Sequence, residues 1–191
     1  MFIKSVVALF AAAAVSAAPA IKVARDDLQP WQITRLYTHT PSGNPGNDPH
    51  SVLNFTISDP NTIPAGQTPT GQAVFPPTTA ICSLRYLTSA DAPWGVEQPC
   101  TTDNSTNAYS TWTFTLNHPN GSNGEASTNF DLEFKLVDHV QIPGQEVTKT
   151  FTAGDHFEVG DNMGGQCGGS GVCSWNLQNL PYDVQQTQED A

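Results

Sequence analysis

The fold of this chain is decided by the stretch that reads Asn129-Phe130-Asp131-Leu132-Glu133-Phe134-Lys135-Leu136. Large apolar and charged side chains alternate there with a period of two. In an extended strand this period places the apolar side chains on one face and the charged ones on the other. The apolar face has to be buried, whereas the charged face meets water. Residues 129–140 are therefore predicted to form a half-buried β-strand over a hydrophobic core.

The same alternation recurs along the chain in weaker form. It predicts further strands at 31–37, 52–57, 80–87, 108–116 and 172–177, and a hairpin of 146–152 with 155–159 that turns at Ala153-Gly154. Residues 59–77 are rich in Pro and Gly and are expected to form a long irregular connection. Seven or eight short antiparallel strands imply an all-β fold, either a β-sandwich or a β-barrel, in which apolar faces bury one another.

The N-terminus has the layout of a secretory signal peptide at residues 1–17. Lys4 supplies a basic start, an apolar run follows, and Val15-Ser16-Ala17 ends it with small side chains. The run is shorter than the roughly 20 residues that cross a bilayer. We therefore expect a secreted, extracellular protein. Its parts would be a spacer or short propeptide at 18–28, one β domain at 29–180 and a flexible acidic tail at 181–191.

The charge of the chain restricts its partners. It has 18 acidic residues against 7 Lys and Arg, a formal net charge of −11. A protein that neutralises phosphates needs a clustered basic face, and the few basic residues here are scattered. The same argument applies to an anionic membrane surface. We therefore expect no nucleic-acid partner and no membrane insertion.

All four cysteines lie after the signal-like segment, and an even number in an oxidising compartment indicates two disulfides. Three pairings exist. Proximity in sequence favours Cys82 with Cys100 and Cys167 with Cys173, because a long stretch of predicted strands separates the two pairs. A four-cysteine metal site would need two compact pairs, and these spacings do not provide them.

Three sequons mark candidate N-glycosylation sites in an exported chain. Asn104 and Asn120 lie in a predicted loop and a predicted turn, where they would be exposed. Asn54 lies inside a predicted strand, with its side chain on the face opposite Leu53. The alternative for each is an unmodified surface Asn.

The sequence contains no convincing catalytic constellation. Ser170 lies in a Gly-rich run that lacks the closing glycine of the nucleophile elbow. The five histidines show neither of the usual zinc spacings, and the acidic group Asp155, Glu158 and Asp161 lacks the loop spacing of a calcium site. We predict a non-enzymatic protein without metal or cofactor.

Two weaker sequence patterns could instead indicate residues that bind or cleave carbohydrates. Asp131 and Glu133 would share one strand face about 6 to 7 Å apart, a spacing that glycoside hydrolysis allows but that any solvated strand also shows. Trp94, Trp112 and Tyr86 could form an aromatic platform for sugars, with core packing as the alternative. Trp94 lies between Pro93 and Gly95, so it is the ring expected to be exposed.

Residues 31–61 resemble small secreted fungal proteins grouped with hypersensitive-response-inducing elicitors. The resemblance is carried by Trp31-Gln32-Ile33-Thr34-Arg35-Leu36, by Pro41-Ser42-Gly43 and by Leu53-Asn54-Phe55-Thr56-Ile57-Ser58-Asp59-Pro60-Asn61. The layout is also similar to the Alternaria major-allergen domain. The chain lacks the cysteine before the first strand that links the dimer of that allergen, so we expect a monomer.

The resemblance implies a compact β-barrel or sandwich without a known catalytic centre, secreted into the plant apoplast or cell wall. Its expected function is that of an effector or elicitor, which induces the hypersensitive response by surface recognition. The expected partner is a plant receptor or a cell-wall component. The alternative function is that of a secreted carbohydrate-binding or glycan-hydrolysing protein, acting through Trp94 or the pair Asp131 and Glu133.

Overall fold

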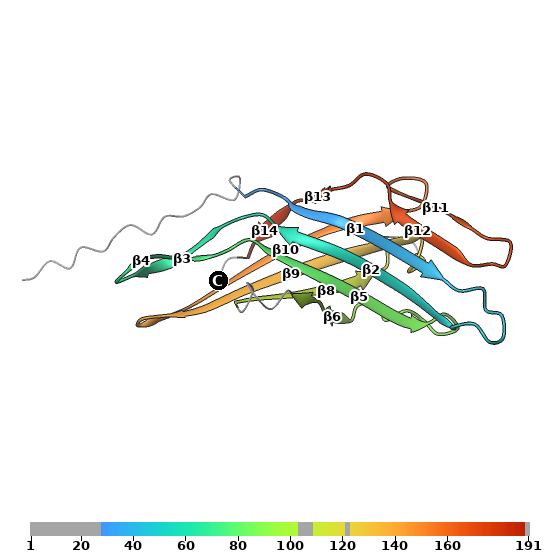
Figure 1. The fold of residues 1–191 in the computed structure, drawn as a ribbon, viewed down its shortest axis with the longest axis horizontal. Coiled ribbons are helices and arrows are strands. Elements are labelled where there is room, and N and C mark those ends of the chain that lie inside the picture. Colours follow the sequence, from blue (N-terminus) through green and yellow to red (C-terminus); the bar gives the residue numbers. More distant parts are fainter. Residues whose placement is uncertain (1–27, 103–108, 121–122, 190–191) are drawn as a thin grey trace, which may run out of the picture.

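The computed structural model describes residues 28–102, 109–120 and 123–189, and these form β-strands joined by turns and loops, without a helix (Figure 1). The first sheet has the strand order β11 (Met163–Cys167), β12 (Cys173–Leu177), β1 (Trp31–Thr40), β2 (His50–Asp59), β5 (Thr78–Leu87) and β7 (Thr101–Thr102), with β13 (Tyr182–Val184) also paired to β1. The second has the order β14 (Gln186–Gln188), β10 (Gln145–Glu158), β9 (Asn129–Ile142), β8 (Ser110–Asn117) and β6 (Glu97–Pro99). A separate hairpin pairs β3 (Ile63–Thr68) with β4 (Gly71–Phe75). All ladders between named strands are antiparallel.

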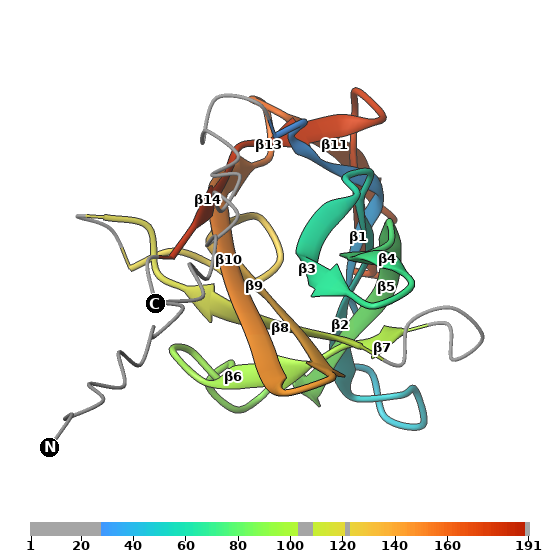
Figure 2. The same cartoon turned by 90° about the vertical axis from the view of Figure 1, so that its left-hand side faces the viewer.

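The two sheets face each other and form a β-sandwich (Figure 2). Both have open edges, so the sandwich is the correct one of the two predicted architectures. The alternation that predicted β9 is confirmed, because Phe130, Leu132, Phe134 and Leu136 are buried whereas Asp131, Glu133 and Lys135 lie on the outer face. Farther along the strand, Asp138 is an exception and is buried. Edge-to-face ring contacts join the sheets, with Phe55 of β2 5.0 Å from Phe114 and 5.4 Å from Phe134 between ring centroids. Such pairs add to the free energy of apolar burial.

The predicted irregular connection at 59–77 is wrong, because β3 and β4 form a hairpin there. Pro64 lies in β3 next to a register shift. The regular pattern of backbone hydrogen bonds is interrupted there, so a residue without an amide proton is tolerated. Ile63 and Phe75 are buried, so the hairpin contributes to the core. The Pro and Gly residues of this segment therefore did not prevent β3 and β4 from pairing as a separate two-stranded sheet.

The predicted hairpin turn at Ala153-Gly154 is also wrong. β10 runs without interruption and pairs along its whole length with β9, and the turn lies instead at Pro143-Gly144. Gly144 has φ of 78°, which glycine adopts without strain. Gly154 serves packing, since a Cβ there would lie 3.2 Å from the carbonyl oxygen of Leu132.

Residues 182–188, predicted as part of a flexible tail, instead form β13 and β14. β13 pairs with β1 and β14 pairs with β10, so the C-terminal segment contacts both sheets. The described residues thus contain fourteen strands rather than seven or eight. Short strands such as β6, β7 and β14 carry too few residues to show a period in the sequence.

Polar side chains are buried at the end of the sandwich where β1 and β8 begin. Asn61 donates from its backbone nitrogen and from its amide to the carboxylate of Asp59, over 2.9 and 2.6 Å. The same amide donates to the carbonyl oxygen of Gln29, and the backbone nitrogen of Gln29 donates back to Asn61. Ser110 donates to Asp138 over 2.6 Å. We call this region the closed end and define it by Gln29, Asp59, Asn61, Ser110 and Asp138.

No helix in the described part of the chain is long and apolar enough to cross a membrane. The predicted signal peptide at residues 1–17 lies outside the described residues, as does the spacer up to residue 27.

Candidate functional site

A pocket of about 350 Å³ opens at the opposite end of the sandwich, where β1 and β5 finish and β2 begins (Figure 1). We call it the end pocket. Its lining comes from four segments that are separated in the sequence, and comprises Thr40, Ser51, Tyr86, Thr88, Ala90, Asp91, Ala92, Trp94, Glu125, Ala126 and Ser127. The pocket thus combines two aromatic rings with hydroxyl and carboxylate groups.

Trp94 is the principal aromatic group of the end pocket. It is partly exposed and partly packed against the core, so neither the exposed ring nor the core packing that the sequence left open applies in full. The ring of His118 stacks on the indole with centroids 3.8 Å apart and an angle of 25° between planes. His118 does not line the pocket, so its imidazole supports the indole from outside the site.

Tyr86 is the second aromatic group, and the structure brings it into the same pocket as Trp94. Burial raises the pKa of the Tyr86 phenol above its ordinary value, and the nearby Glu125 carboxylate also raises it. The phenol therefore keeps its proton at any physiological pH and remains a hydrogen-bond donor. Ser51 and Thr88 beside it exchange a hydrogen bond of 2.8 Å.

Trp112, the third aromatic candidate, has a structural role. It is 1% exposed and packs edge-to-face on Trp31, with ring centroids 4.6 Å apart. Its indole nitrogen donates to Thr78 over 3.4 Å. Trp112 therefore belongs to the core, which was the alternative interpretation of its position.

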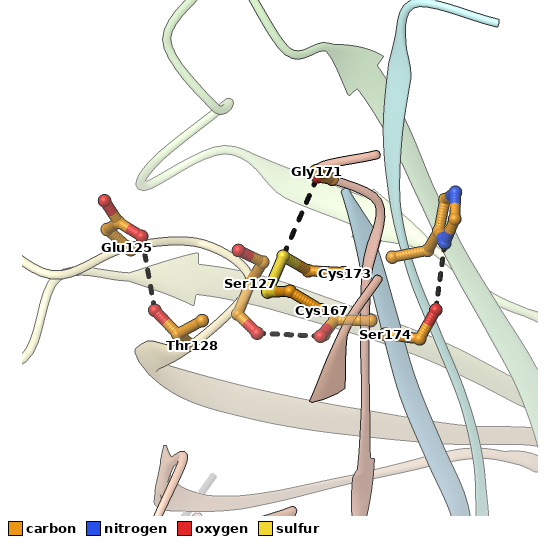
Figure 3. The surroundings of a disulfide bond; sticks show 9 residues. Glu125, Ser127, Thr128, Cys167, Gly171, Cys173 and Ser174 are labelled. Atoms are coloured by element: carbon orange, nitrogen blue, oxygen red, sulfur yellow. Dashed lines mark hydrogen bonds between the residues drawn. A yellow bond between two sulfur atoms is a disulfide. The ribbon is translucent and has the colours of Figure 1, made fainter. Parts of the chain in front are cut away.

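The loop that carries Glu125 and Ser127 is held in place by neighbouring strands. Thr38 of β1 is fully buried and donates to the carbonyl oxygen of Ser127 over 2.7 Å. The Cys167–Cys173 disulfide lies beside this loop (Figure 3), and Cys173 is the register partner of the pocket residue Thr40. One wall of the end pocket is therefore built on a covalently closed hairpin.

The opposite wall belongs to the segment between the other two cysteines. The Cys82–Cys100 disulfide closes this segment, which leaves β5 of the first sheet and reaches β6 of the second. Within it, Gly95 donates from its backbone nitrogen to the carbonyl oxygen of Leu116 over 2.8 Å. Both predicted disulfides are therefore confirmed, and both support the end pocket.

Asp131 and Glu133 do not form one site. Both lie on the outer face of β9, but Asp131 lines a hollow of about 370 Å³ with His156, Asn129 and Asn120. Glu133 lines a separate groove of about 510 Å³ over the second sheet, with Glu97 and Lys135. The predicted acid pair is divided between two hollows, so Asp131 and Glu133 do not face each other across one cleft as that interpretation requires.

His156 connects two of the acidic residues that the sequence singled out. Its Nδ1 lies 2.7 Å from Asp131 and its Nε2 lies 3.4 Å from Glu158. The hydrogen bond with Asp131 is the main cause of a raised His156 pKa, and Glu158 adds to it. Because both ring nitrogens face carboxylates, the doubly protonated ring suits this position and is not placed to remove a proton from a substrate.

The sequons differ in their surroundings. Asn120 is exposed at the rim of the hollow that contains Asp131. Asn54 lies on the outer face of β2, where its side-chain oxygen accepts a hydrogen bond of 2.6 Å from Ser83. Asn104 lies outside the described residues. Within the described ranges, no group of three or more His, Cys, Asp or Glu side chains could hold a metal ion.

Several pocket residues could not be found from the sequence. Asp91, Glu125 and Ser127 occur in polar stretches with no motif, and only the packing of four chain segments places them together. The sequence feature that pointed to this region was the position of Trp94 between Pro93 and Gly95. No protein-family model, curated protein or solved structure matches the chain.

Proposed function

We propose that the protein is a secreted, non-catalytic recognition protein that binds a cell-wall carbohydrate in the end pocket. The observation that carries the proposal is that Trp94 and Tyr86 share one polar-lined pocket. Aromatic rings supply a flat apolar surface on which the C–H face of a sugar ring can pack. Hydroxyl and carboxylate groups around the rings can then hydrogen-bond to the sugar hydroxyls.

The size and preorganisation of the end pocket support this proposal. Its volume of about 350 Å³ lies near the lower end of the range for small-molecule sites, about 300 to 1,000 Å³. It therefore suits one or two sugar units of a longer chain. The His118 stack and the two disulfides restrain its walls before a ligand arrives, which lowers the entropic cost of binding.

Secretion is part of the proposal and rests on three features. These are the signal-like layout of residues 1–17, the two disulfides, and the sequons at Asn54 and Asn120. Disulfides form and persist in oxidising compartments. N-glycosylation takes place in the same export pathway.

The resemblance of residues 31–61 to fungal elicitors supports a second, compatible role. A protein that binds a wall carbohydrate in the plant apoplast would be placed where a host receptor could recognise it. Infiltration of the purified protein into leaves tests this role, with cell death or a defence response as the expected result. An absence of any response would remove the elicitor role without affecting carbohydrate binding.

Binding to insoluble chitin, cellulose and β-glucan, followed by titration calorimetry with soluble oligomers, tests the main proposal. Trp94→Ala is expected to weaken binding by about tenfold, because an aromatic contact contributes about 0.5 to 1.5 kcal/mol beyond the apolar area that it buries. Tyr109→Ala is the matched control, since Tyr109 is 47% exposed and lies at the closed end. Equal binding by Trp94→Ala and the unsubstituted protein, or binding to none of these glycans, would refute the proposal.

A further inference from the structure

The end pocket carries negative charge on its rim. Asp91 and Glu125 are both exposed and line it, and none of its described lining residues is Lys or Arg. The chain as a whole has a net charge of −11, so the surrounding field has the same sign. A ligand with positive charge is therefore attracted to this pocket, whereas an anionic one is repelled.

We infer that the end pocket selects oligosaccharides that carry ammonium groups, such as glucosamine oligomers from deacetylated chitin. The inference rests on the proposed carbohydrate-binding function and names its ligand class. A glucosamine unit offers both chemistries that the pocket holds: a C–H face for Trp94 and an ammonium group for the carboxylates. A neutral or acetylated sugar would use only the first.

Glu125 has the capacity to accept such a group. One of its oxygens, Oε2, accepts a hydrogen bond of 3.3 Å from Thr128. A carboxylate has about four acceptor positions, so this bond orients the group without saturating it. The Glu125 carboxylate also lies close enough to Tyr86 to affect the phenol electrostatically, which places it near the aromatic part of the pocket.

Asp91 lies on the other wall of the pocket, in the segment that carries Trp94. The aromatic ring and one carboxylate thus belong to the same loop, and Glu125 faces them from the loop before β9. This arrangement places negative charge on two sides of a bound sugar. Because both carboxylates are exposed, each is expected to change affinity by at most about fivefold, the usual limit for solvated ion pairs.

Calorimetry with three soluble hexamers, namely glucosamine, N-acetylglucosamine and galacturonate, tests the inference. The glucosamine hexamer is expected to bind at least about fivefold more tightly than the acetylated one at low salt. The difference in affinity should disappear near 1 M NaCl, where the Debye length falls to about 3 Å and exposed charges are largely screened from each other. Galacturonate should bind most weakly.

Charge-neutral variants test which groups are responsible. Glu125→Gln and Asp91→Asn should each reduce the preference for glucosamine, and the double variant should bind both hexamers equally. Glu133→Gln is the matched control, since Glu133 is an exposed carboxylate outside the end pocket. All four variants change surface groups, and thermal melting verifies that they fold.

The results separate the inference from the proposed function. If acetylated oligomers bind through Trp94 and neither Glu125→Gln nor Asp91→Asn changes the ratio, the inference is wrong and the carbohydrate site stands. Tighter binding of galacturonate would also refute the inference alone. If no hexamer binds, the inference fails, and the proposed function is then decided by the binding to cellulose and β-glucan described above.

Discussion

At one end of the sandwich the loops surround the end pocket, whereas at the closed end polar side chains lie inside the protein and bond to one another. Asp59 and Asp138 are 3% and 2% exposed, but Asp91 and Glu125 meet solvent. A buried polar group has to be paired within the protein, because an unpaired one costs about 1 to 3 kcal/mol. Carboxylates at the closed end therefore serve stability, and those at the end pocket remain able to meet a ligand.

The two ends also differ in how they are held together. The closed end depends on hydrogen bonds between segments such as Gln29 and Asn61. The walls of the end pocket are tied by both disulfides, because loops with few buried apolar contacts gain little stability from the core. This contrast predicts that the two ends respond differently to the same kind of perturbation.

Removing the Cys82–Cys100 disulfide is expected to have the largest effect. The Cys82→Ala and Cys100→Ala double variant should lose about 3 kcal/mol in free energy of unfolding, since the bond closes a sequence separation of 18 and restrains the unfolded chain. Urea denaturation measures the loss. Hydrogen exchange should show amides of residues 88–99 losing protection before those of the closed end. Equal loss at both ends would contradict the proposed division of the molecule.

Asn61→Ala is expected to break the closed end. It removes the side-chain amide that donates to the Asp59 carboxylate and to the Gln29 carbonyl oxygen, and that accepts from the Gln29 backbone nitrogen. Only the donation from the backbone nitrogen of residue 61 to Asp59 is kept. The free energy of unfolding should fall by about 2 to 3 kcal/mol. Carbohydrate binding below the melting temperature should be unchanged. Asn47→Ala, at an exposed Asn, is the control and should cost less than about 0.5 kcal/mol.

The closed end should also make stability depend on pH. Burial raises the pKa of Asp138 to about 6, and nearby Asp59 adds to the shift, while Ser110 and Lys149 oppose it. Because the folded pKa exceeds that of the unfolded chain, stability is greatest below about pH 4 for this group and falls as the pH rises through 6. The loss should be about 2 kcal/mol. Asp138→Asn should abolish it, as measured by urea denaturation at pH 4 to 7.

Two surface groups shape the same pH profile. The raised pKa of His156 means that its stabilisation is complete below 6.5 and is lost as the pH rises through the folded value. The pKa of Asp48 is lowered to about 2 by hydrogen bonds from Arg85 and His50, so its stabilisation is present above 3.8 and is lost at lower pH. Maximal stability is therefore expected in mildly acidic solution. A maximum above pH 7 would contradict this assignment.

Thr38→Val should have the smallest effect on stability and a selective effect on binding. It keeps the shape of a buried side chain but removes the hydrogen bond to Ser127, which costs about 1 kcal/mol. The loop that carries Glu125 should loosen, so carbohydrate affinity should fall a few fold in calorimetry. Thr34→Val, at an exposed position on the same strand, is the control. Unchanged affinity would show that this loop does not shape the pocket.

Much of the fold could be predicted because strand periodicity is local. The alternation at Phe130, Leu132 and Phe134 identified a core face, and cysteine spacing identified both disulfides. The prediction failed where local signals conflict with packing. Gly154 was read as a turn, yet it stays in β10 because its missing side chain admits the backbone of β9.

The candidate site could be predicted only in part. The Pro-Trp-Gly context placed Trp94 in a loop, because prolines and glycines mark loops, and the ring is partly exposed there. The sequence grouped Tyr86 with Trp94 as a candidate aromatic platform, but it did not indicate that Glu125, in a distant loop, would line the same pocket. Nor could it separate Asp131 from Glu133, whose side chains share a strand face but enter different hollows.

By itself, the sequence determined the all-β class, the apolar face of each long strand and the pairing of the cysteines. These depend on neighbouring residues, because side chains alternate along a strand and nearby cysteines meet readily. Only the tertiary structure decided which loops lie together, and so where Trp94, Tyr86 and Glu125 form a pocket. The physical reason is that strand order and register bring together residues far apart in the chain, and local periodicity carries no information about either.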